Sequence, residues 1–336
     1  MEKKVILLSL PPLRLLPEFK AQLEAAGNGR EVLVSMDPAV IEPHLDRIEI
    51  GMGDIPLDLV PRMKGFKWWQ LWSAGADILQ RLPALKELLF KLCISTGMHG
   101  QQMTEHLFAM LLGWSRCMST AYTVQREHKW LMVKDQQLSS LAGKTMLILG
   151  YGTIGRTMAK IALAFGMKVT GLCRNPGAAR HSEGNKDLPP SFEDSGGVMV
   201  AEAAKLKEFL PLSDYVVNIL PSTPDTRHYF GAAEFSAMKN SALYINLGRG
   251  ATTCEADLID ALRKKSIAGA LLDVTEIEPL PADSPLWDMD NVIITGHYAG
   301  CHPDYTRMAM AIALDNLGRY NRGEPLKNLV DKKRGY

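Results

Sequence analysis

Short hydrophobic runs alternate with amphipathic stretches in the N-terminal part of the chain. The runs at residues 5–10, 32–35, 47–50, 68–72 and 91–95 each predict a β-strand. Between the first two, residues 17–26 have helical periodicity and stop at Gly27-Asn28-Gly29, which is typical of a helix C-terminus. This strand–helix–strand alternation predicts a parallel sheet covered by helices.

A long, mostly hydrophobic stretch follows, from Thr104 to about residue 129. It predicts one helix with Thr104 as its N-cap and Glu105 in its first turn. Because this helix is longer than most helices of globular proteins, we expect it to bridge two domains or to bury a face against a second subunit.

A second series of strands and helices then begins. Strands are predicted at 145–149, 168–173, 214–219, 242–246, 269–272 and 292–294, with a helix from the glycine-rich turn after the first strand to residue 165. Residues 175–201 are rich in Gly, Pro, Ser and charge and predict an extended surface loop. The amphipathic stretch 304–322 predicts a final helix that returns to the first domain.

The length and composition are those of a globular protein. A chain of 336 residues is long enough for two domains, and 46% hydrophobic and 22% charged residues are ordinary values. A net charge of +1 gives no indication of binding to nucleic acid or to an acidic membrane. The N-terminal hydrophobic run soon meets Pro11, Pro12 and Arg14, so it predicts a strand and not a signal peptide, and no run is long enough to span a bilayer.

The five cysteines are dispersed, without C-x-x-C spacing. This pattern indicates a reducing compartment, with neither disulfides nor zinc. We therefore expect a cytoplasmic protein without a metal site.

The glycine-rich turn between a predicted strand and a predicted helix indicates a dinucleotide site. In Gly150-Tyr151-Gly152-Thr153-Ile154-Gly155, the first glycine permits a tight turn and the second lets the backbone approach a pyrophosphate. The third lets the helix pack closely on the strand. Backbone N–H groups near Thr153 and Ile154, at the helix N-terminus, are left to bind phosphate.

The end of the next strand bears on which dinucleotide binds. An acidic residue is expected there to bind the ribose 2′-OH of NAD, but this chain has Cys173 followed by Arg174 and Asn175. Without a carboxylate a 2′-phosphate is not repelled, and a guanidinium can pair with it. The sequence therefore favours NADP(H), with NAD(H) as the alternative if Arg174 stacks on the adenine instead.

Polar residues follow three later strands of this series: Arg249 lies between two glycines, Asp273 precedes Glu278 by five positions, and His297 comes near the end. Because the carboxyl ends of the strands line the ligand crevice of an open α/β sheet, we expect these side chains near the dinucleotide. An arginine can hold a carbonyl oxygen, and a histidine backed by a carboxylate can transfer a proton. Beside a nicotinamide, these groups suffice to reduce a 2-oxo acid.

Several motifs occur in order and at fitting distances, at residues 72–77, 150–155, 220–224, 246–250, 273–279, 295–300 and 323–336. Together they resemble the D-isomer-specific 2-hydroxyacid dehydrogenase family, in particular its glyoxylate/hydroxypyruvate reductase-like members. The resemblance covers essentially the whole chain. It implies an α/β fold in which a Rossmann dinucleotide-binding domain, residues 102–298, is inserted into a flavodoxin-like substrate domain formed by 1–101 and 299–336. It also implies a homodimer formed largely through the dinucleotide domains.

The resemblance implies a role for each residue. Arg249 would hold the carbonyl and carboxylate of the substrate, His297 would donate the proton during reduction, and Glu278 would hydrogen-bond His297 and favour its imidazolium. The carboxylate would bind to the backbone of Ala74, Gly75 and Ala76, and Asp273 would meet the nicotinamide carboxamide. The implied cofactor-binding residues are Gly150, Gly152, Thr153, Ile154, Gly155, Arg174, Asn175, Pro221, Thr226, Leu247, Asp273 and His297.

The chain departs from the family pattern at Gly296, where a proline usually precedes the histidine, and at Thr275, which is usually aromatic. The 175–201 segment is also longer than typical. The choice of Glu278 over Glu276 as the partner of the histidine rests on the motif register, since either glutamate could reach a histidine.

The side chains that would select the substrate are not identified by the sequence. Trp68 and Trp72 share one face of a predicted strand and Trp69 the other, and we expect all three in the core. Weaker candidates for the pocket rim are Leu10-Pro11-Pro12, Met98, His99 and Trp130. His99, His106 and His302 are expected as helix-end or pocket-wall residues.

Three functions are compatible with the chain. The first is an NADPH-dependent reductase of small 2-oxo acids such as glyoxylate or hydroxypyruvate. The second is a dehydrogenase of the same fold acting on phosphoglycerate, phosphite or formate, although formate enzymes pair their histidine with glutamine, whereas this chain has Glu278. The third is a dinucleotide-sensing corepressor. We expect the first.

Overall fold

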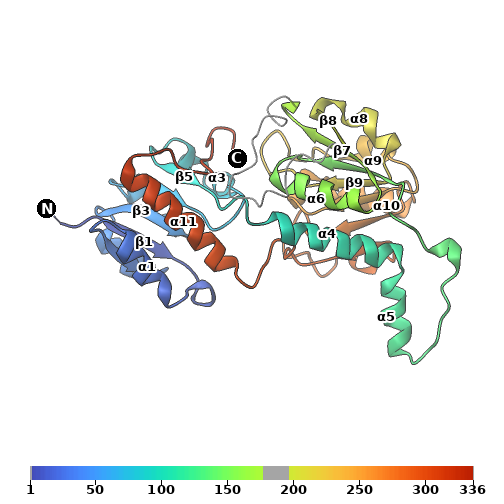
Figure 1. The fold of residues 1–336 in the computed structure, drawn as a ribbon, viewed down its shortest axis with the longest axis horizontal. Helices are drawn as coiled ribbons and strands as arrows, with labels where there is room; N and C mark the ends of the chain where they lie inside the picture. The colour runs from blue at the N-terminus through green and yellow to red at the C-terminus, as the bar shows by residue number, and fades with distance from the viewer. Residues whose placement is uncertain (1, 177–196, 336) are drawn as a thin grey trace. The chain divides into compact units, whose positions relative to one another are not determined.

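The computed structural model describes residues 2–176 and 197–335. The chain forms two compact units, Met1–Met98 with His302–Tyr336, and His99–Cys301 (Figure 1). Each unit is built on one parallel sheet with helices on its faces, so the predicted α/β class is confirmed.

The first unit contains a parallel sheet with the strand order β2-β1-β3-β4-β5. Its strands are β1 Val5–Ser9, β2 Glu31–Val34, β3 Ile48–Gly53, β4 Trp68–Gln70 and β5 Lys91–Cys93. This is the flavodoxin-like order, and each strand predicted in this part of the chain is confirmed to within a few residues.

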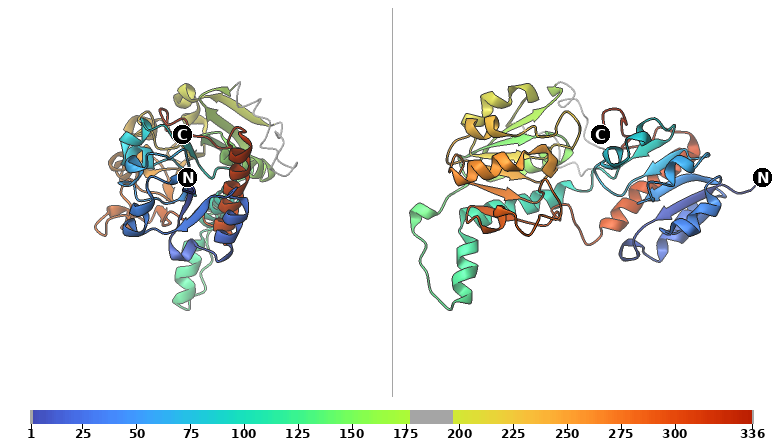
Figure 2. Two further views of the ribbon diagram at one scale, coloured as in Figure 1. Left: turned by 90° about the vertical axis from the view of Figure 1, so that its left-hand side faces the viewer. Right: turned by 180° about the vertical axis from the view of Figure 1, so that it is seen from behind.

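Helices cover both faces of the first sheet (Figure 2). They are α1 Glu18–Ala26, α2 Pro38–Ile41, α3 Ile78–Arg81 and α11 Tyr305–Arg322. Side chains alternate along β1, so that Ile6 and Leu8 pack in the hydrophobic cluster with α1 and α11, whereas Val5 and Leu7 pack in the cluster on the other face. Burying one such side chain stabilises the fold by about 1.5–3 kcal/mol.

The three tryptophans lie in these cores, as predicted. Trp68 and Trp72 belong to the cluster with α1 and α11, and Trp69 belongs to the cluster on the opposite face. All three side chains are at most 1% exposed. Met98 is also buried in the cluster with Trp68.

The second unit contains a parallel sheet with the order β12-β11-β10-β9-β6-β7-β8. Its strands are β6 Thr145–Leu149, β7 Lys168–Cys173, β8 Val198–Glu202, β9 Tyr215–Asn218, β10 Leu243–Asn246, β11 Gly269–Leu272 and β12 Val292–Ile294. Counted from β6, this is the dinucleotide-binding order 3-2-1-4-5-6 with one further strand beyond it.

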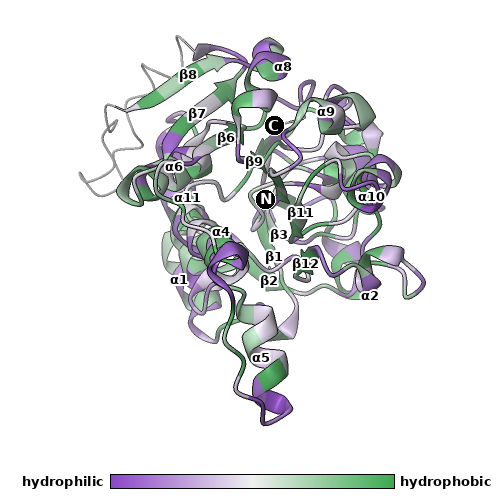
Figure 3. Cartoon of the chain, turned by 90° about the vertical axis from the view of Figure 1, so that its right-hand side faces the viewer, coloured by the Kyte–Doolittle hydropathy of each residue, from purple (hydrophilic) through white to green (hydrophobic). Residues whose placement is uncertain are grey.

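Helices also cover both faces of the second sheet. They are α4 Gly100–Ser115, α6 Thr153–Ala164, α8 Leu206–Phe209, α9 Ala232–Ala237 and α10 Glu255–Arg263, whereas α5 Met118–Arg126 follows α4 and packs on neither face. Met146 and Ile148 of β6 pack in the cluster with α4 and α6, and Leu147 and Leu149 pack with α9 and α10. The strands of this sheet are hydrophobic, and polar residues gather on the surrounding helices (Figure 3).

The prediction of one helix from Thr104 to about residue 129 is wrong. The helix begins at Gly100, and Thr104 lies inside it, where its hydroxyl donates to the Gly100 carbonyl. The chain then breaks at Cys117, which has a φ of +52°. Beyond Ser115 the chain leaves the hydrophobic core, and every residue of α5 is at least partly exposed, so no packing keeps the two helices in line.

The prediction of a loop over residues 175–201 is wrong at its C-terminal end. Val198–Glu202 form β8, which pairs with β7 in parallel. The strand is missed because its short hydrophobic run directly follows a stretch rich in Gly, Ser and charge, from which the whole segment was predicted to be a loop. Residues 177–196 of the predicted loop lie outside the described residues.

The described helices include none that is both long and apolar enough to cross a membrane. The five cysteines are free thiols.

Candidate active site

The glycine turn joins the carboxyl end of β6 to the N-terminus of α6. Gly150 has a φ of +101°, which favours glycine. A Cβ atom on Gly155 would lie 2.9 Å from the Gly150 carbonyl oxygen, so that a side chain there would force the helix away from the strand. A Cβ atom on Gly152 would meet no atom of the described residues within 4 Å.

These three environments fit a dinucleotide. Within the part of the chain that the structure describes, the backbone at Gly152 borders open space, as close approach of a pyrophosphate requires, and Gly152 precedes the first residue of α6, Thr153. Because α6 runs from Thr153 to Ala164, its N-terminus offers aligned backbone N–H groups and a positive dipole end.

The carboxyl end of β7 carries the residues expected to select the dinucleotide. The strand ends at Cys173, as predicted, and the Arg174 side chain is half exposed. The Arg174 Nη2 atom lies 3.9 Å from Asp225 Oδ2, a long, solvated contact. The guanidinium is therefore held only weakly by this carboxylate.

Two other predicted cofactor residues hold a turn after β9. The Thr226 hydroxyl donates to the Pro221 carbonyl oxygen at 2.6 Å and accepts from the Thr223 amide at 2.8 Å. Leu247 is buried in the core, and its amide donates to the Asn218 carbonyl. Their contact with a cofactor stays a prediction.

Arg249 lies on a turn that is fixed on both sides. A Cβ atom on Gly248 would lie 2.8 Å from the Leu220 carbonyl oxygen, and one on Gly250 would lie 1.8 Å from the Thr275 carbonyl oxygen. The Asn246 side chain at the end of β10 accepts from the Gly248 amide and donates to the Arg249 carbonyl. Asn246 lies in the motif at residues 246–250, but its hydrogen bonds to the arginine turn were not predicted; its place at a strand end, just before Arg249, was the available signal.

His297 and Glu278 form a hydrogen-bonded pair. His297 Nδ1 lies 2.7 Å from Glu278 Oε2, and the other carboxylate oxygen, Oε1, accepts from the Thr275 amide at 3.2 Å. Both side chains are partly exposed, at 47% for His297 and 36% for Glu278. The His297 imidazole is thus partly exposed to solvent, while the Glu278 carboxylate hydrogen-bonds to its Nδ1 atom.

The electrostatics of the pair favour the charged forms of both groups. The pKa of His297 is raised by its hydrogen bond to Glu278, although partial burial and the Arg249 charge act to lower it. For Glu278, burial acts to raise the pKa, but the hydrogen bond and charge of His297, the Thr275 amide and Arg249 together lower it. Arg249 acts on both partners, so the three groups share one electrostatic environment.

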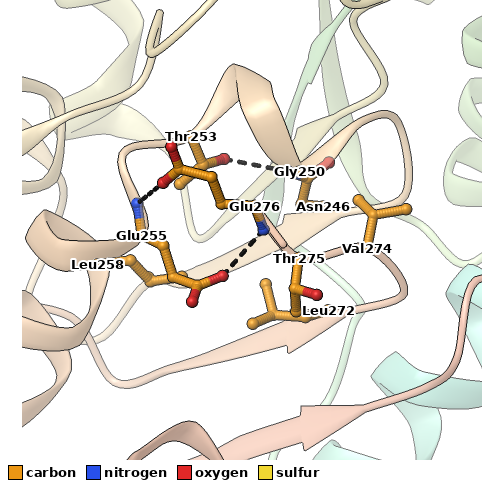
Figure 4. A pocket seen from close by; sticks show the side chains of 9 residues that line it. All are labelled: Asn246, Gly250, Thr253, Glu255, Leu258, Leu272, Val274, Thr275 and Glu276. Carbon is orange, nitrogen blue, oxygen red and sulfur yellow. Dashed lines mark hydrogen bonds between the residues drawn. The ribbon is translucent and has the colours of Figure 1, made fainter. Parts of the chain in front are cut away.

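Glu276 is engaged elsewhere, which bears on the choice between the two glutamates. Its Oε1 atom lies 2.5 Å from His228 Nε2, and its Oε2 atom accepts from the Glu255 amide at 3.1 Å. The Glu255 carboxylate in turn accepts from the Glu276 amide at 2.9 Å, and this reciprocal pair closes a small pocket beside Thr275 (Figure 4). Glu278 is therefore the glutamate that contacts His297.

Asp273 is buried at the end of β11 and holds the loop that carries His297. Its carboxylate accepts from the Thr295 hydroxyl and from the Tyr298 and Ala299 amides. The His106 Nε2 atom of α4 lies 2.9 Å from the same hydroxyl. The predicted contact of Asp273 with the nicotinamide stays a prediction; its support of the loop was not anticipated.

His99 is the N-cap residue of α4 and is 6% exposed. Burial lowers the pKa of His99 to about 4, and the charge of Arg249 adds to this effect. A Cβ atom on Gly300 would lie 3.1 Å from the His99 ring. His99 is thus an uncharged histidine at a helix end, beside the residues that follow His297.

The loop expected to bind a carboxylate lies in the first unit, between β4 and α3. The Ser73 hydroxyl donates to the Gly75 carbonyl at 2.7 Å, and the Ala76 carbonyl accepts from the Leu79 amide.

Two of the weaker pocket candidates are exposed: Trp130, at 95%, and His302, whose Nδ1 accepts from the Asp304 amide.

Comparison with known proteins gives a consistent result. Residues 108–299 match the family model described as the NAD binding domain of D-isomer specific 2-hydroxyacid dehydrogenases. Glyoxylate/hydroxypyruvate reductase B of Escherichia fergusonii is 33% identical over 309 residues, covering 88% of this chain and 90% of that protein. The protein of the same name from Enterobacter sp. strain 638 is 40% identical over 190 residues, or 56% of this chain and 54% of its own length, so this match spans about half of each.

Solved structures with a similar fold cover nearly the whole chain. An NADPH-dependent glyoxylate/hydroxypyruvate reductase from Sinorhizobium meliloti, in complex with NADP and sulfate, is 30% identical with a TM-score of 0.81, covering 99% of this chain and all of that one. A D-isomer specific 2-hydroxyacid dehydrogenase from Xanthobacter autotrophicus, in complex with NADPH and MES, has the same identity and TM-score and covers 98% of this chain and 99% of that one.

Proposed function

This chain belongs to the D-isomer specific 2-hydroxyacid dehydrogenase family, and we propose that it reduces small 2-oxo acids, such as glyoxylate or hydroxypyruvate, to D-2-hydroxy acids with NADPH. The observation that carries the proposal is the His297–Glu278 pair, with an Nδ1–Oε2 distance of 2.7 Å, beside Arg249. This arrangement supplies a proton donor and a fixed cation in one place.

The residues of the chain would share the work as follows. Arg249 is held by its turn and would bind the carboxylate and the carbonyl oxygen of the substrate, which fixes the plane of the reacting group. His297 would donate its Nε2 proton to the carbonyl oxygen while Glu278 accepts from Nδ1. When bound, the nicotinamide supplies the hydride to the carbonyl carbon. The product is the 2-hydroxy acid, and His297 is left neutral.

The raised pKa of His297 suits the reductive direction. The imidazolium is the form that donates a proton, and a raised pKa extends the pH range in which it is populated. We therefore expect the reduction rate to be highest below the pKa of His297 and to fall as pH rises through it. The reverse reaction needs neutral imidazole and should show the opposite dependence.

The preference for NADPH rests on the end of β7. Cys173 and Arg174 stand where an acidic residue would bind the ribose of NAD, and the Arg174 guanidinium is half exposed. The S. meliloti and X. autotrophicus relatives, solved with NADP and NADPH, support the same preference. We assign substrate binding to the first unit, where Ala74, Gly75 and Ala76 lie on the loop before α3.

The decisive experiment is one panel of assays. NADPH and NADH oxidation is followed with glyoxylate, hydroxypyruvate, pyruvate and phenylpyruvate. The proposal expects turnover with at least one small 2-oxo acid and a D-configured product. A purified, folded protein that turns over none of them would overturn it.

The cofactor assignment has its own test. Arg174→Ala should raise the KM for NADPH by about tenfold or more and leave the KM for NADH nearly unchanged, because only NADPH has the phosphate that the guanidinium pairs with. Asp225→Ala is the matched control, since it removes the carboxylate 3.9 Å from Arg174 and should not weaken NADPH. Equal losses for both cofactors in Arg174→Ala would contradict the role.

We also propose a homodimer formed through the second unit. In that unit α5 and the segment after it stand off from the sheet (Figures 1 and 2). This extension exposes Trp130 at 95%, Met132 at 82%, Tyr122 at 59% and Leu131 at 54%. Such a concentration of exposed apolar side chains marks an interaction surface, and a second copy of the chain is the partner we assign to it.

Light scattering of the purified chain tests the dimer. The double variant Trp130→Ser with Met132→Ser should shift the mass from dimer to monomer. Leu89→Ser replaces an equally exposed side chain of the first unit and serves as the control. A wild-type chain that is monomeric at micromolar concentration would refute the proposal.

A further inference from the structure

The loop that carries His297 has a conformation that needs support. His297 has a φ of +56°, in the left-handed region that side chains other than glycine rarely adopt. Residues held in this region persist when the surrounding contacts over-determine them. Its amide donates to the Asp273 carbonyl at 2.8 Å, and the next two amides donate to the Asp273 carboxylate at 3.1 and 3.0 Å.

Thr295 extends this support to a different element. Its amide donates to the Leu272 carbonyl at 2.8 Å, and its hydroxyl donates to Asp273 Oδ1 at 2.7 Å. A hydroxyl has one hydrogen, which is here given to a carboxylate that can only accept. The His106 Nε2 atom, 2.9 Å from the same hydroxyl oxygen, must therefore be the donor, which assigns the proton of His106 to Nε2.

The surroundings of His106 favour this hydrogen bond. Its side chain is 13% exposed, and its ring meets Tyr298 edge to face with centroids 5.2 Å apart. Burial lowers the pKa of His106, and Asp273, whose Oδ1 lies 3.6 Å from Nε2, opposes that effect. The neutral ring with its proton on Nε2 is thus the form present near neutral pH.

We propose that His106 is a positioning residue for the reaction: through Thr295 and Asp273 it holds residues 295–299, and with them the His297 imidazole, in register with Glu278. The proposal rests on the proposed function for its effect on turnover. It does not make His106 a proton relay, because its chain of hydrogen bonds ends at the Asp273 carboxylate, whereas the His297 ring bonds to Glu278.

Three variants separate positioning from packing. His106→Phe keeps a flat ring against Tyr298 and removes the donor. His106→Gln offers an N–H at a similar distance from the backbone and should restore most of the function. Thr295→Val removes the hydroxyl while keeping the shape of the side chain. Gln101→Ala, on the exposed face of α4, is the control.

The first measurement is kcat, taken with thermal stability so that each rate refers to folded enzyme. His106→Phe and Thr295→Val should each lower kcat by about tenfold, with the KM for NADPH unchanged. The double variant should be no worse than either single one, because both changes cut the same chain of hydrogen bonds. A kcat of His106→Phe within twofold of the wild-type value, or equal losses in His106→Phe and His106→Gln, would overturn the proposal.

The second measurement needs no turnover, so it distinguishes a failure of this proposal from a failure of the proposed function. NMR titration gives the pKa of the His297 ring, which responds to Glu278, Arg249 and Asp273. In His106→Phe a loosened loop weakens the contact with Glu278, and the pKa of His297 should fall by roughly half a unit. An unchanged His297 titration in His106→Phe and Thr295→Val would refute the positioning role, whatever the enzyme reduces.

Discussion

Gly150 and His297 are both held at positive φ, at +101° and +56°, in loops that follow strands of the same sheet. At Gly150 the residue itself permits the conformation, because glycine has no Cβ atom. At His297 the proposed proton transfer requires a side chain, so the same kind of backbone turn has to be held by neighbours: Asp273 accepts from the loop, and His106 contacts the Thr295 hydroxyl. The first loop is therefore encoded locally, and the second by contacts that span up to 189 residues.

The two loops also differ in what their proposed functions require of the residue. A phosphate is bound by backbone N–H groups, for which any residue without a side chain in the way is sufficient. A proton donor needs one imidazole in one orientation, hydrogen-bonded on one nitrogen and accessible on the other. The glycine turn can therefore tolerate variation around it, whereas the histidine loop depends on several buried partners.

The largest expected effect comes from removing the imidazole without changing the loop. His297→Asn should lower kcat by about a thousandfold, since general acid catalysis typically contributes 10²–10⁴-fold. Asparagine is among the residues that best tolerate positive φ, so the backbone should be kept. NADPH binding, measured by fluorescence, should remain. If kcat survives in this variant, another group donates the proton.

The fold was predictable where the strands appear in the sequence as hydrophobic runs. Most strands of the two sheets are largely buried, and the edge strands β2 and β12, which are only partly buried, still consist mainly of Val, Leu and Ile. The edge strand β8 was missed, because its hydrophobic run directly follows a stretch rich in Gly, Ser and charge. The break at Cys117 could not be predicted, because the periodicity of residues 104–129 does not tell where the packing surface under α4 ends.

The site was predictable where residue type alone carries the role. Gly150, Gly152 and Gly155 have the three environments that the pattern implies, and Glu278 contacts His297 as the motif register suggested. Asn246 and Thr295 lie in sequence motifs, and His106 was expected at a helix end or a pocket wall, but the hydrogen bonds of these three residues were not predicted, because they depend on which distant atoms the side chains meet. A hydrogen bond between positions 106 and 295 leaves no periodic signal in one sequence.

Glu278→Gln tests whether the charge of Glu278 sets the pKa of His297. Glutamine keeps the size but removes the charge that raises the pKa of His297, while partial burial and Arg249 still lower it. Since reduction needs imidazolium, the rate should begin to fall at lower pH than in the wild type. At pH 8 the loss of kcat should be roughly ten- to a hundredfold. An alkaline limb that does not move in the pH profile would argue against Glu278 as the group that tunes His297.

Gly152→Ala tests whether the glycine turn leaves space for the pyrophosphate of the cofactor. Gly152 has a φ of −96°, which alanine can adopt, and its added Cβ atom would meet none of the residues 2–176 and 197–335 within 4 Å. The unfolding free energy should therefore stay unchanged while the KM for NADPH rises about tenfold, because the methyl group fills the space that the pyrophosphate needs. Gly155→Ala is the contrasting variant, since its Cβ atom would lie 2.9 Å from the Gly150 carbonyl and should cost about 1–3 kcal/mol of stability. Equal changes in the unfolding free energy and in the KM for NADPH in the two variants would mean that Gly152 and Gly155 do not have separate roles in cofactor binding and in packing.

The smallest effect is expected at Glu276, two residues before Glu278. Glu276→Gln removes a charge that lies near His228 and Arg227, and its side chain is 24% exposed, so the stability loss should be at most about 1 kcal/mol. The pKa of Glu276 is lowered because His228, the Glu255 amide and Arg227 together outweigh its burial, so this small stabilisation is present at neutral pH and lost as pH falls through that lowered value. The pH profile of kcat should remain that of the wild type, because Glu276 contacts His228 and Glu255, whereas Glu278 contacts His297. A shift of the alkaline limb in Glu276→Gln as large as in Glu278→Gln would mean that the charge of the whole segment, and not the hydrogen bond from Glu278, sets the protonation of the histidine.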